Sequence, residues 1–267
     1  MTEWNAAGYA QISGLQAAMA AEVLALVSFT GGERVLDVGC GDGKITAAIA
    51  TRVPRGSVVG VDPSHDMIAF ATAHFSGADH SNLRFEPGDA RTLPFRDAFD
   101  RVVSFNALHW VPEQDAALRS IRRALTVAGQ AQLRLVPDGE RTSLETVVEQ
   151  ARRAPRWAPA FADFRDPYLH LLPAQYAALA ERNGLRVTSL RVQDKAWDFG
   201  SRDAFHAFCG VGLVAWTQRL PEPDRAAFVD DALDRYRAAI GAGPGEAAMF
   251  RFYQMDVTLA CAPGGAP

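Results

Sequence analysis

The stretch VLDVGCGDGK at residues 35–44 constrains this chain more than any other part of its sequence. An apolar run leads into Gly39, Gly41 and Gly43, and the residues that follow, KITAAIATRV, have helical spacing. Glycine adopts backbone angles closed to other residues and lets a ligand approach the backbone, while a helix start offers unbonded N–H groups. The sequence therefore predicts a strand, a tight turn and a helix, with a small polar ligand at the turn. A turn that binds nothing is the plainer alternative.

Two carboxylates near this turn bear on what binds there. Asp37 lies two residues before Gly39, where it would face cationic or amino groups and not a pyrophosphate. Asp62 ends the apolar run SVVGVD about twenty residues after the glycines, where a carboxylate can accept hydrogen bonds from both ribose hydroxyls. A glycine-rich turn alone would equally suit a dinucleotide, and a strand-end acid can simply be solvated. The combination favours a nucleoside.

Strand and helix patterns alternate along most of the chain. Apolar runs at 34–38, 58–61 and 101–105 are typical of central strands covered on both faces. Helical spacing is seen at 15–29 and 115–127. Further strands are predicted at NLRFEPGD, QAQLRLV, LRVTSLRV and FRFYQMDVTLA. We expect one α/β domain over residues 1–267, with a doubly wound, mostly parallel sheet of seven strands.

Two segments, 138–172 and 200–245, interrupt this alternation and are interpreted as helical insertions that form a lid over the carboxyl ends of the strands. Their aromatic side chains would form a satellite core, and a share of them would line an apolar pocket. The arginines of the first insertion would either clamp an acidic substrate or form a solvated face. The aromatic residues, which lie largely within the two insertions, are Trp157, Phe161, Phe164, Tyr168, Trp197, Phe199, Phe205, Phe208 and Trp216, and the arginines are Arg152, Arg153, Arg156 and Arg165.

Composition excludes several classes of protein. The formal net charge of -4 provides no broad positive field for nucleic acid, so a small-molecule partner is expected. The cysteines Cys40, Cys209 and Cys261 are widely spaced without a CxxC pair, which argues against a disulfide framework and a structural zinc site. Neither a signal peptide nor a membrane-spanning run is evident, so a cytoplasmic protein without membrane association is expected. The oligomeric state does not follow from the sequence.

The order of these motifs resembles that of the class I S-adenosylmethionine-dependent methyltransferases, over about residues 30–195. VLDVGCGDGK, VVGVDPS, GDARTLPF and FDRVVSFNALHWV are similar to the family's first four motifs. The resemblance implies a Rossmann-like fold, S-adenosylmethionine as cofactor and S-adenosylhomocysteine as product. It assigns Asp37, Gly39 and Gly41 to the methionine moiety, Asp62 to the ribose, Asp89 and Ala90 to the adenine edge, Pro63 and Met67 to the adenine ring, and Cys40 and Asn106 to the same cofactor site.

The segment NALHWV is similar to the branch that holds trans-aconitate, malonyl-carrier-protein and juvenile hormone acid methyltransferases, which methylate carboxylates. An N-terminal segment with Tyr9 and Gln16 adds to this likeness and supplies candidate substrate-binding residues, together with His109 and Trp110. The resemblance implies O-methylation of a small carboxylate; O-, N- or C-methylation of a secondary metabolite stays open. A protein that binds the cofactor without turnover is the third hypothesis.

His109 separates the first two hypotheses. A carboxylate is already an anion, so its methylation needs alignment and removal of water but no base. A phenol or hydroxyl must lose a proton, and His109 would then be the base. A role in positioning or packing is equally compatible with a lone histidine.

Two other subclasses fit less well. The nucleic-acid N-methylating members have an (N/D)PP(Y/F) tetrad where this chain has Asn106-Ala107-Leu108-His109, so the asparagine matches and the prolines do not. No cluster of acidic residues stands at the strand ends for magnesium, and no metal is expected.

Overall fold

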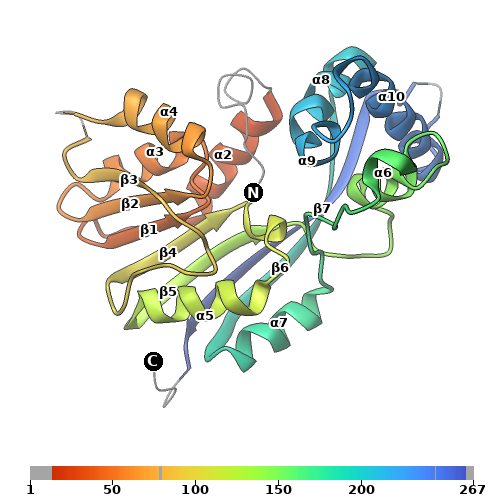
Figure 1. Cartoon of the computed structure of the whole chain (residues 1–267). Helices are drawn as coiled ribbons and strands as arrows, with labels where there is room; N and C mark the ends of the chain where they lie inside the picture. The colour runs from red at the N-terminus through yellow and green to blue at the C-terminus, as the bar shows by residue number, and fades with distance from the viewer. Residues whose placement is uncertain (1–13, 78–79, 244, 263–267) are drawn as a thin grey trace.

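A sheet of seven strands organises the computed structural model, which describes residues 14–77, 80–243 and 245–262 (Figure 1). The strands are β1 Arg34–Val38, β2 Ser57–Asp62, β3 Leu83–Pro87, β4 Phe99–Phe105, β5 Leu125–Leu135, β6 Leu185–Asp198 and β7 Met249–Cys261. Their order is β3-β2-β1-β4-β5-β7-β6. Strand β7 runs antiparallel to β5 and β6, and the other pairs are parallel. The predicted doubly wound, mostly parallel sheet is confirmed.

Helices cover both faces of this sheet. The helices α2 Gly14–Leu26, α3 Lys44–Arg52 and α4 His65–Phe75 lie on one face, and α5 Gln114–Ala124 and α7 Pro173–Arg182 lie on the other (Figure 1). Successive strand residues alternate between the faces, so Val35 packs with the α3 side while Leu36 packs with the α5 and α7 side. Burial on both faces explains why the central strands are continuous apolar runs.

Two helix boundaries differ from the predictions. The helix expected over 115–127 ends at Ala124, because Leu125 is extended and pairs with Phe99 of β4. The pairing of β4 with β5 then shifts register between Phe99 and Arg101. The residues 125–129 thus lengthen a strand that the sequence pattern placed later. The N-terminal helix expected over 15–29 ends at Leu26.

Strands β6 and β7 extend beyond the rest of the sheet. The pairs between β5 and β7 stop at Leu135 and Met255, whereas those between β6 and β7 continue to Asp198 and Met249. Residues 193–198 and 249–254 therefore form a two-stranded ribbon, which projects from the edge where the carboxyl ends of the parallel strands lie.

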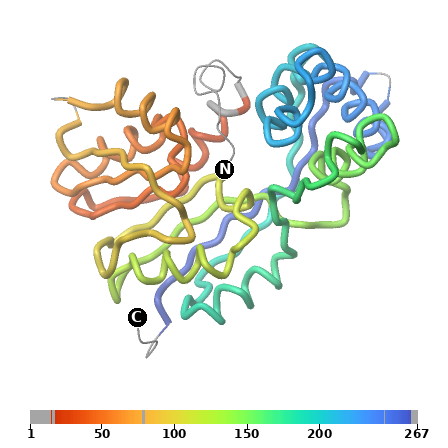
Figure 2. The backbone as a smooth tube through the Cα atoms, in the orientation of Figure 1, coloured from red at the N-terminus to blue at the C-terminus, as the bar shows by residue number. Residues whose placement is uncertain are grey.

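This ribbon carries a separate group of helices from the two insertions (Figure 2). The first insertion, 138–172, supplies α6 Leu144–Arg152 and the short helix η3 Ala158–Phe161. The second, 200–245, supplies α8 Arg202–Gly212, α9 Val214–Thr217 and α10 Glu222–Ala239.

The two insertions share one apolar core with the ribbon. The Trp157 ring of the first lies 5.4 Å from the Phe228 ring of the second, and the Phe205 ring lies 5.7 Å from that of Phe250 on the ribbon. Both insertions therefore stand together at the carboxyl edge of the sheet. Their closure as a lid stays a prediction.

Candidate functional site

The glycine-rich turn joins β1 to α3 and opens beside a cavity. Gly39 and Gly41 have φ angles of +78° and +54°, in the left-handed region that favours glycine. A Cβ atom on Gly39 would lie 2.2 Å from the Cβ atom of Ala107, so the close approach of the β4 loop requires glycine there. A Cβ atom on Gly41 would meet nothing within 4 Å. The backbone at Gly41 is therefore open to a ligand.

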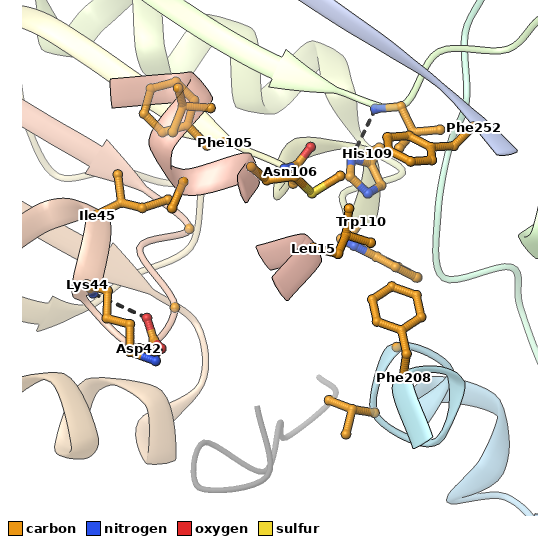
Figure 3. A pocket seen from close by; sticks show the side chains of 18 of the residues that line it. Leu15, Asp42, Lys44, Ile45, Phe105, Asn106, His109, Trp110, Phe208 and Phe252 are labelled. Atoms are coloured by element: carbon orange, nitrogen blue, oxygen red, sulfur yellow. Dashed lines mark hydrogen bonds and ion pairs between the residues drawn. The ribbon is translucent and has the colours of Figure 1, made fainter. Parts of the chain in front are cut away.

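The cavity has a volume of about 410 Å³ and lies at the carboxyl ends of β1, β4 and β5. Two sides can be distinguished in Figure 3, where Asp42 and Lys44 stand apart from His109, Trp110 and Phe208. We call the part beside the glycine-rich turn the turn side and the part beneath the insertions the helix side. The turn side comprises Asp37, residues 39–42, Lys44 and Ile45. The helix side comprises His109, Trp110, Leu144, Glu145, Phe208, Cys209, Val211, Gly212, Leu213, Phe250 and Phe252. Leu15, Met19, Ala20, Val23, Phe105, Asn106 and Val136 complete the lining.

Asp37 is a buried carboxylate on the turn side. Its Oδ2 atom accepts a hydrogen bond of 2.7 Å from the Thr46 hydroxyl of α3. Burial raises the pKa of Asp37 to about 7; the hydrogen bond from Thr46 opposes this rise, and the nearby charge of Asp62 adds to it. A cation placed in this part of the cavity would favour the ionised form of Asp37.

Asp62 lies at the end of β2, behind the turn. Its Oδ2 atom accepts a hydrogen bond from the backbone N–H of Gly41 at 3.0 Å, and its Oδ1 atom accepts one from Ser64 N–H at 2.9 Å. These bonds hold the carboxylate beside the open backbone of Gly41. The side chain is buried and is not part of the cavity wall.

The four residues assigned to the adenine do not line this cavity. Ala90 and Met67 are buried, and Pro63 is exposed. The Asp89 carboxylate forms a two-pronged pair with Arg91, whose Nε donates to Oδ1 at 2.9 Å and Nη2 to Oδ2 at 2.6 Å. These bonds from Arg91 hold the pKa of Asp89 below its usual value. A contact between Asp89 and adenine, which stays a prediction, would have to share the carboxylate with Arg91.

Asn106 ends β4 with a φ angle of +57°, which is uncommon for a residue other than glycine and typical of functional loops. Its backbone N–H donates to the Arg134 carbonyl at 2.7 Å. Its side chain receives a hydrogen bond of 3.4 Å from Gln254 of the ribbon and contacts the Met19 sulfur of α2 at 3.8 Å. Asn106 therefore links the end of β4 to the ribbon and to α2.

His109 lies in the short helix η2 Leu108–Trp110, and its side chain is almost fully buried at the cavity. The backbone N–H of Val136 donates to its Nδ1 atom at 3.4 Å (Figure 3). Burial lowers the pKa of His109 well below its usual value, and His170 contributes to the same shift. The ring is therefore neutral. Because Nδ1 accepts, the hydrogen is assigned to Nε2.

Several wall residues were not singled out from the sequence. Leu15 and Met19 of α2, Phe250 and Phe252 of the ribbon, and Glu145 at the start of α6 all line the cavity. The apolar ones carry ordinary helix or strand patterns, and only the fold brings them to the cavity. Among the predicted aromatic residues, Phe208 lines the cavity, whereas Trp157, Phe161, Phe205 and Trp216 are buried in the core of the insertions.

The candidate clamp of arginines lies elsewhere. The Arg152 guanidinium pairs with Glu149 at 2.6 Å and Asp166 at 2.8 Å, and that of Arg156 stacks 4.1 Å from the centre of the Trp157 ring. None of Arg152, Arg153, Arg156 and Arg165 lines the cavity.

Two substrate-binding candidates cannot be placed. Tyr9 lies outside the described residues, and Gln16 is in α2 but its side chain is outside the description. In the described ranges, no group of three or more His, Cys, Asp or Glu residues is arranged to hold a metal ion. None of the helices described here combines the length and apolar character needed to cross a bilayer.

Comparison with known proteins bears on this site. Residues 35–129 match a family model described as a methyltransferase domain. The trans-aconitate 2-methyltransferase of Deinococcus radiodurans is 30% identical over 256 residues, covering 93% of this chain and 95% of that protein. The juvenile hormone acid O-methyltransferase of Bombyx mori is 37% identical over 106 residues, 38% of this chain and 37% of that protein. The crystal structure of the YcgJ protein from Bacillus subtilis superposes with a TM-score of 0.68 at 20% identity, covering 93% of this chain and 100% of that one.

Proposed function

Because this chain belongs to the class I S-adenosylmethionine-dependent methyltransferases, in the branch of the trans-aconitate and juvenile hormone acid enzymes, we propose that it methylates a carboxylate oxygen of a small molecule. The observation that carries this proposal is the hydrogen bond from Val136 N–H to Nδ1 of the buried His109 ring. A neutral ring whose Nδ1 accepts from Val136 N–H presents an Nε2–H donor to the cavity. Such a donor suits an anionic oxygen.

The turn side fits the cofactor. S-adenosylmethionine supplies an electrophilic methyl group on a sulfonium, and its transfer to a carboxylate gives a methyl ester and S-adenosylhomocysteine. The open backbone of Gly41 leaves room for the methionine moiety, and the Asp37 carboxylate, which lines the same part of the cavity, would pair with the positive amino group. Asp62, at the other side of the same turn, would accept from the ribose hydroxyls.

The helix side would orient the acceptor and remove its water. The Nε2–H group of His109 would donate to one carboxylate oxygen and leave the other directed at the turn side, where the methyl group is held. The walls from Trp110, Phe208 and Phe252 exclude water from the anion. Alignment and desolvation are the contributions that such a displacement needs, since no proton has to leave.

Methylation of a hydroxyl or phenol would require the opposite protonation of His109. The nitrogen that faces the acceptor would have to be unprotonated, and Nδ1 would then carry the hydrogen toward Val136 N–H, which is itself a donor. Two donors facing each other are unfavourable, so the geometry favours the carboxylate over the hydroxyl.

The test compares His109→Gln and His109→Leu on a panel of carboxylic acids, phenols and amines. The glutamine amide reproduces a donor near the Nε2 position, so it should retain a measurable share of kcat with acids, whereas leucine should not. With carboxylic acids as acceptors, kcat should stay constant as the pH is lowered through 6.5, because the reaction does not need His109 as a base. If only phenols are methylated, and both variants lose kcat to the same extent, the proposal is refuted. If no compound is methylated, a protein that binds the cofactor without turnover is favoured.

A further inference from the structure

We propose that the acceptor is an apolar molecule with a single carboxylate, and that Glu145 excludes acceptors with a second anionic group; this rests on the proposed carboxylate methylation. The first observation is the chemical character of the helix side. Its walls are apolar at Leu144, Phe208, Leu213 and Phe250. Among the described residues, its ionisable side chains are His109, Glu145 and the buried thiol of Cys209. Against an apolar wall, the binding free energy of an apolar acceptor becomes more favourable in proportion to the apolar surface that it buries.

The second observation concerns basic groups. Among the described residues that line the cavity, Lys44 is the only lysine or arginine. It stands on the turn side, where its ammonium pairs with the Asp42 carboxylate at 3.0 Å. A second carboxylate on the acceptor would therefore lose its water in the helix side without gaining a cation, and burying an unpaired charge is strongly unfavourable.

A small cavity of about 20 Å³ adjoins the helix side and shares Leu144, Glu145 and Phe252 with it. Two arginines line this small cavity, but acidic partners already hold them. The Arg141 guanidinium donates to Asp194 at 3.1 Å, and that of Arg251 donates to Glu246 at 2.6 Å. They offer a long acceptor no free cation without breaking an existing pair.

Glu145 adds repulsion to this lack of cations. It belongs to the first turn of α6 and lines both cavities. Burial lowers the pKa of His170, and the charge of Glu145 opposes this shift. Burial raises the pKa of the Cys209 thiol, and the charge of Glu145 adds to that rise. These groups come from the first insertion and from α8, so the field of Glu145 reaches into the space beneath the helices. A second carboxylate there would meet a like charge in a poorly hydrated site. An acceptor with a single carboxylate, held at His109, has no second anionic group that would have to lie near Glu145.

The experiment measures kcat/KM for decanoate and for decanedioate, which differ by one terminal carboxylate. We expect the wild type to prefer decanoate about a hundredfold, and Glu145→Gln to reduce this ratio at least tenfold by raising the rate with the diacid. Glu140→Gln is the matched control, because Glu140 is exposed and lines neither cavity. It should leave the ratio unchanged. A thermal shift with S-adenosylhomocysteine verifies that each variant is folded.

The outcomes separate this inference from the proposed function. Equal rates with both acids, a preference for the diacid, or a ratio that Glu145→Gln does not alter would overturn the inference while carboxylate methylation stands. Methylation of decylamine with neither acid methylated would overturn both. A lowered ratio in Glu145→Gln but not in Glu140→Gln supports the specific role of Glu145.

Discussion

Replacing Asp37 by asparagine should stabilise the protein and weaken its cofactor binding, by amounts that depend on pH. Burial raises the pKa of Asp37 from 3.8 to about 7 in the folded chain. The unfolded chain therefore ionises first as pH rises, and the folded state loses stability between about pH 4 and pH 7. The pKa shift of Asp37 therefore lowers the free energy of unfolding by about 4 kcal/mol above pH 7 and by about 1.6 kcal/mol at pH 5. Asparagine can still accept from Thr46 and never ionises.

The assay is thermal unfolding of wild type and Asp37→Asn at pH 5 and pH 8 without ligand. The variant should gain roughly 10 °C at pH 8 and clearly less at pH 5, since 1 kcal/mol shifts Tm by about 2 to 4 °C in a chain of this size. Asp163→Asn, at an exposed aspartate, is the control and should gain nothing. A variant whose gain is the same at both pH values would refute the argument that burial of the ionised form is costly.

The same shift predicts the pH dependence of cofactor binding. If the ionised form of Asp37 pairs with the amino group, wild-type affinity for S-adenosylhomocysteine should be about tenfold weaker at pH 6 than at pH 8, because a pKa of about 7 leaves roughly a tenth of the carboxyl ionised at pH 6. Calorimetry at both pH values measures this. Asp37→Asn should bind weakly with no such dependence, and a strong, pH-independent wild type would remove Asp37 from the cofactor contact.

Three further predictions concern the ribose site, the buried ion pair and the insertions. Asp62→Ala should weaken S-adenosylhomocysteine binding by roughly 1.5 to 3 kcal/mol for each charged hydrogen bond lost, measured by calorimetry on folded protein. Arg134→Ala should cost about 3 to 5 kcal/mol in denaturant unfolding because it leaves Asp256 buried and unpaired, whereas Arg34→Ala breaks an exposed pair and should cost less than about 1 kcal/mol. Hydrogen exchange in the two insertions should slow on adding S-adenosylhomocysteine; equal protection with and without it would contradict their closure.

Most of the fold could be predicted because its signals are local. The apolar runs that became β1, β2 and β4 and the glycine-rich turn are each readable within a dozen residues. The end of the helix at Ala124 was not readable, because Leu125 pairs with Phe99 of β4 and this pairing overrides the helical spacing of residues 125–127. The ribbon was missed for the same reason, since its extent depends on where β5 stops.

The candidate site was predictable where one segment supplies it and obscure where several meet. Asp37 at the end of β1 and the glycines Gly39 and Gly41 belong to one short segment, and His109 closely follows the end of β4. Glu145 lies in a stretch with no distinguishing pattern, and only the packing of α6 brings it to the cavity. The ion pair between Asp89 and Arg91 could not be predicted either, because the hydrophobic periodicity of a sequence does not show which side chains two residues apart form a pair.

The ribbon of β6 and β7 separates the helix side, where we propose that the acceptor binds, from the sheet that carries the glycine-rich turn. The first insertion leaves the sheet after Leu135 and returns at α7. The second leaves after Asp198, at the end of β6, and returns at Met249, where β7 begins. Most of the apolar side chains between those crossings pack on one another and on Phe250 and Phe252. Substitutions there can therefore accumulate without strain on the glycine-rich turn or on Asp62. If the helix side binds the acceptor as proposed, a lineage with this fold can change the compound it methylates while the glycine-rich turn stays the same.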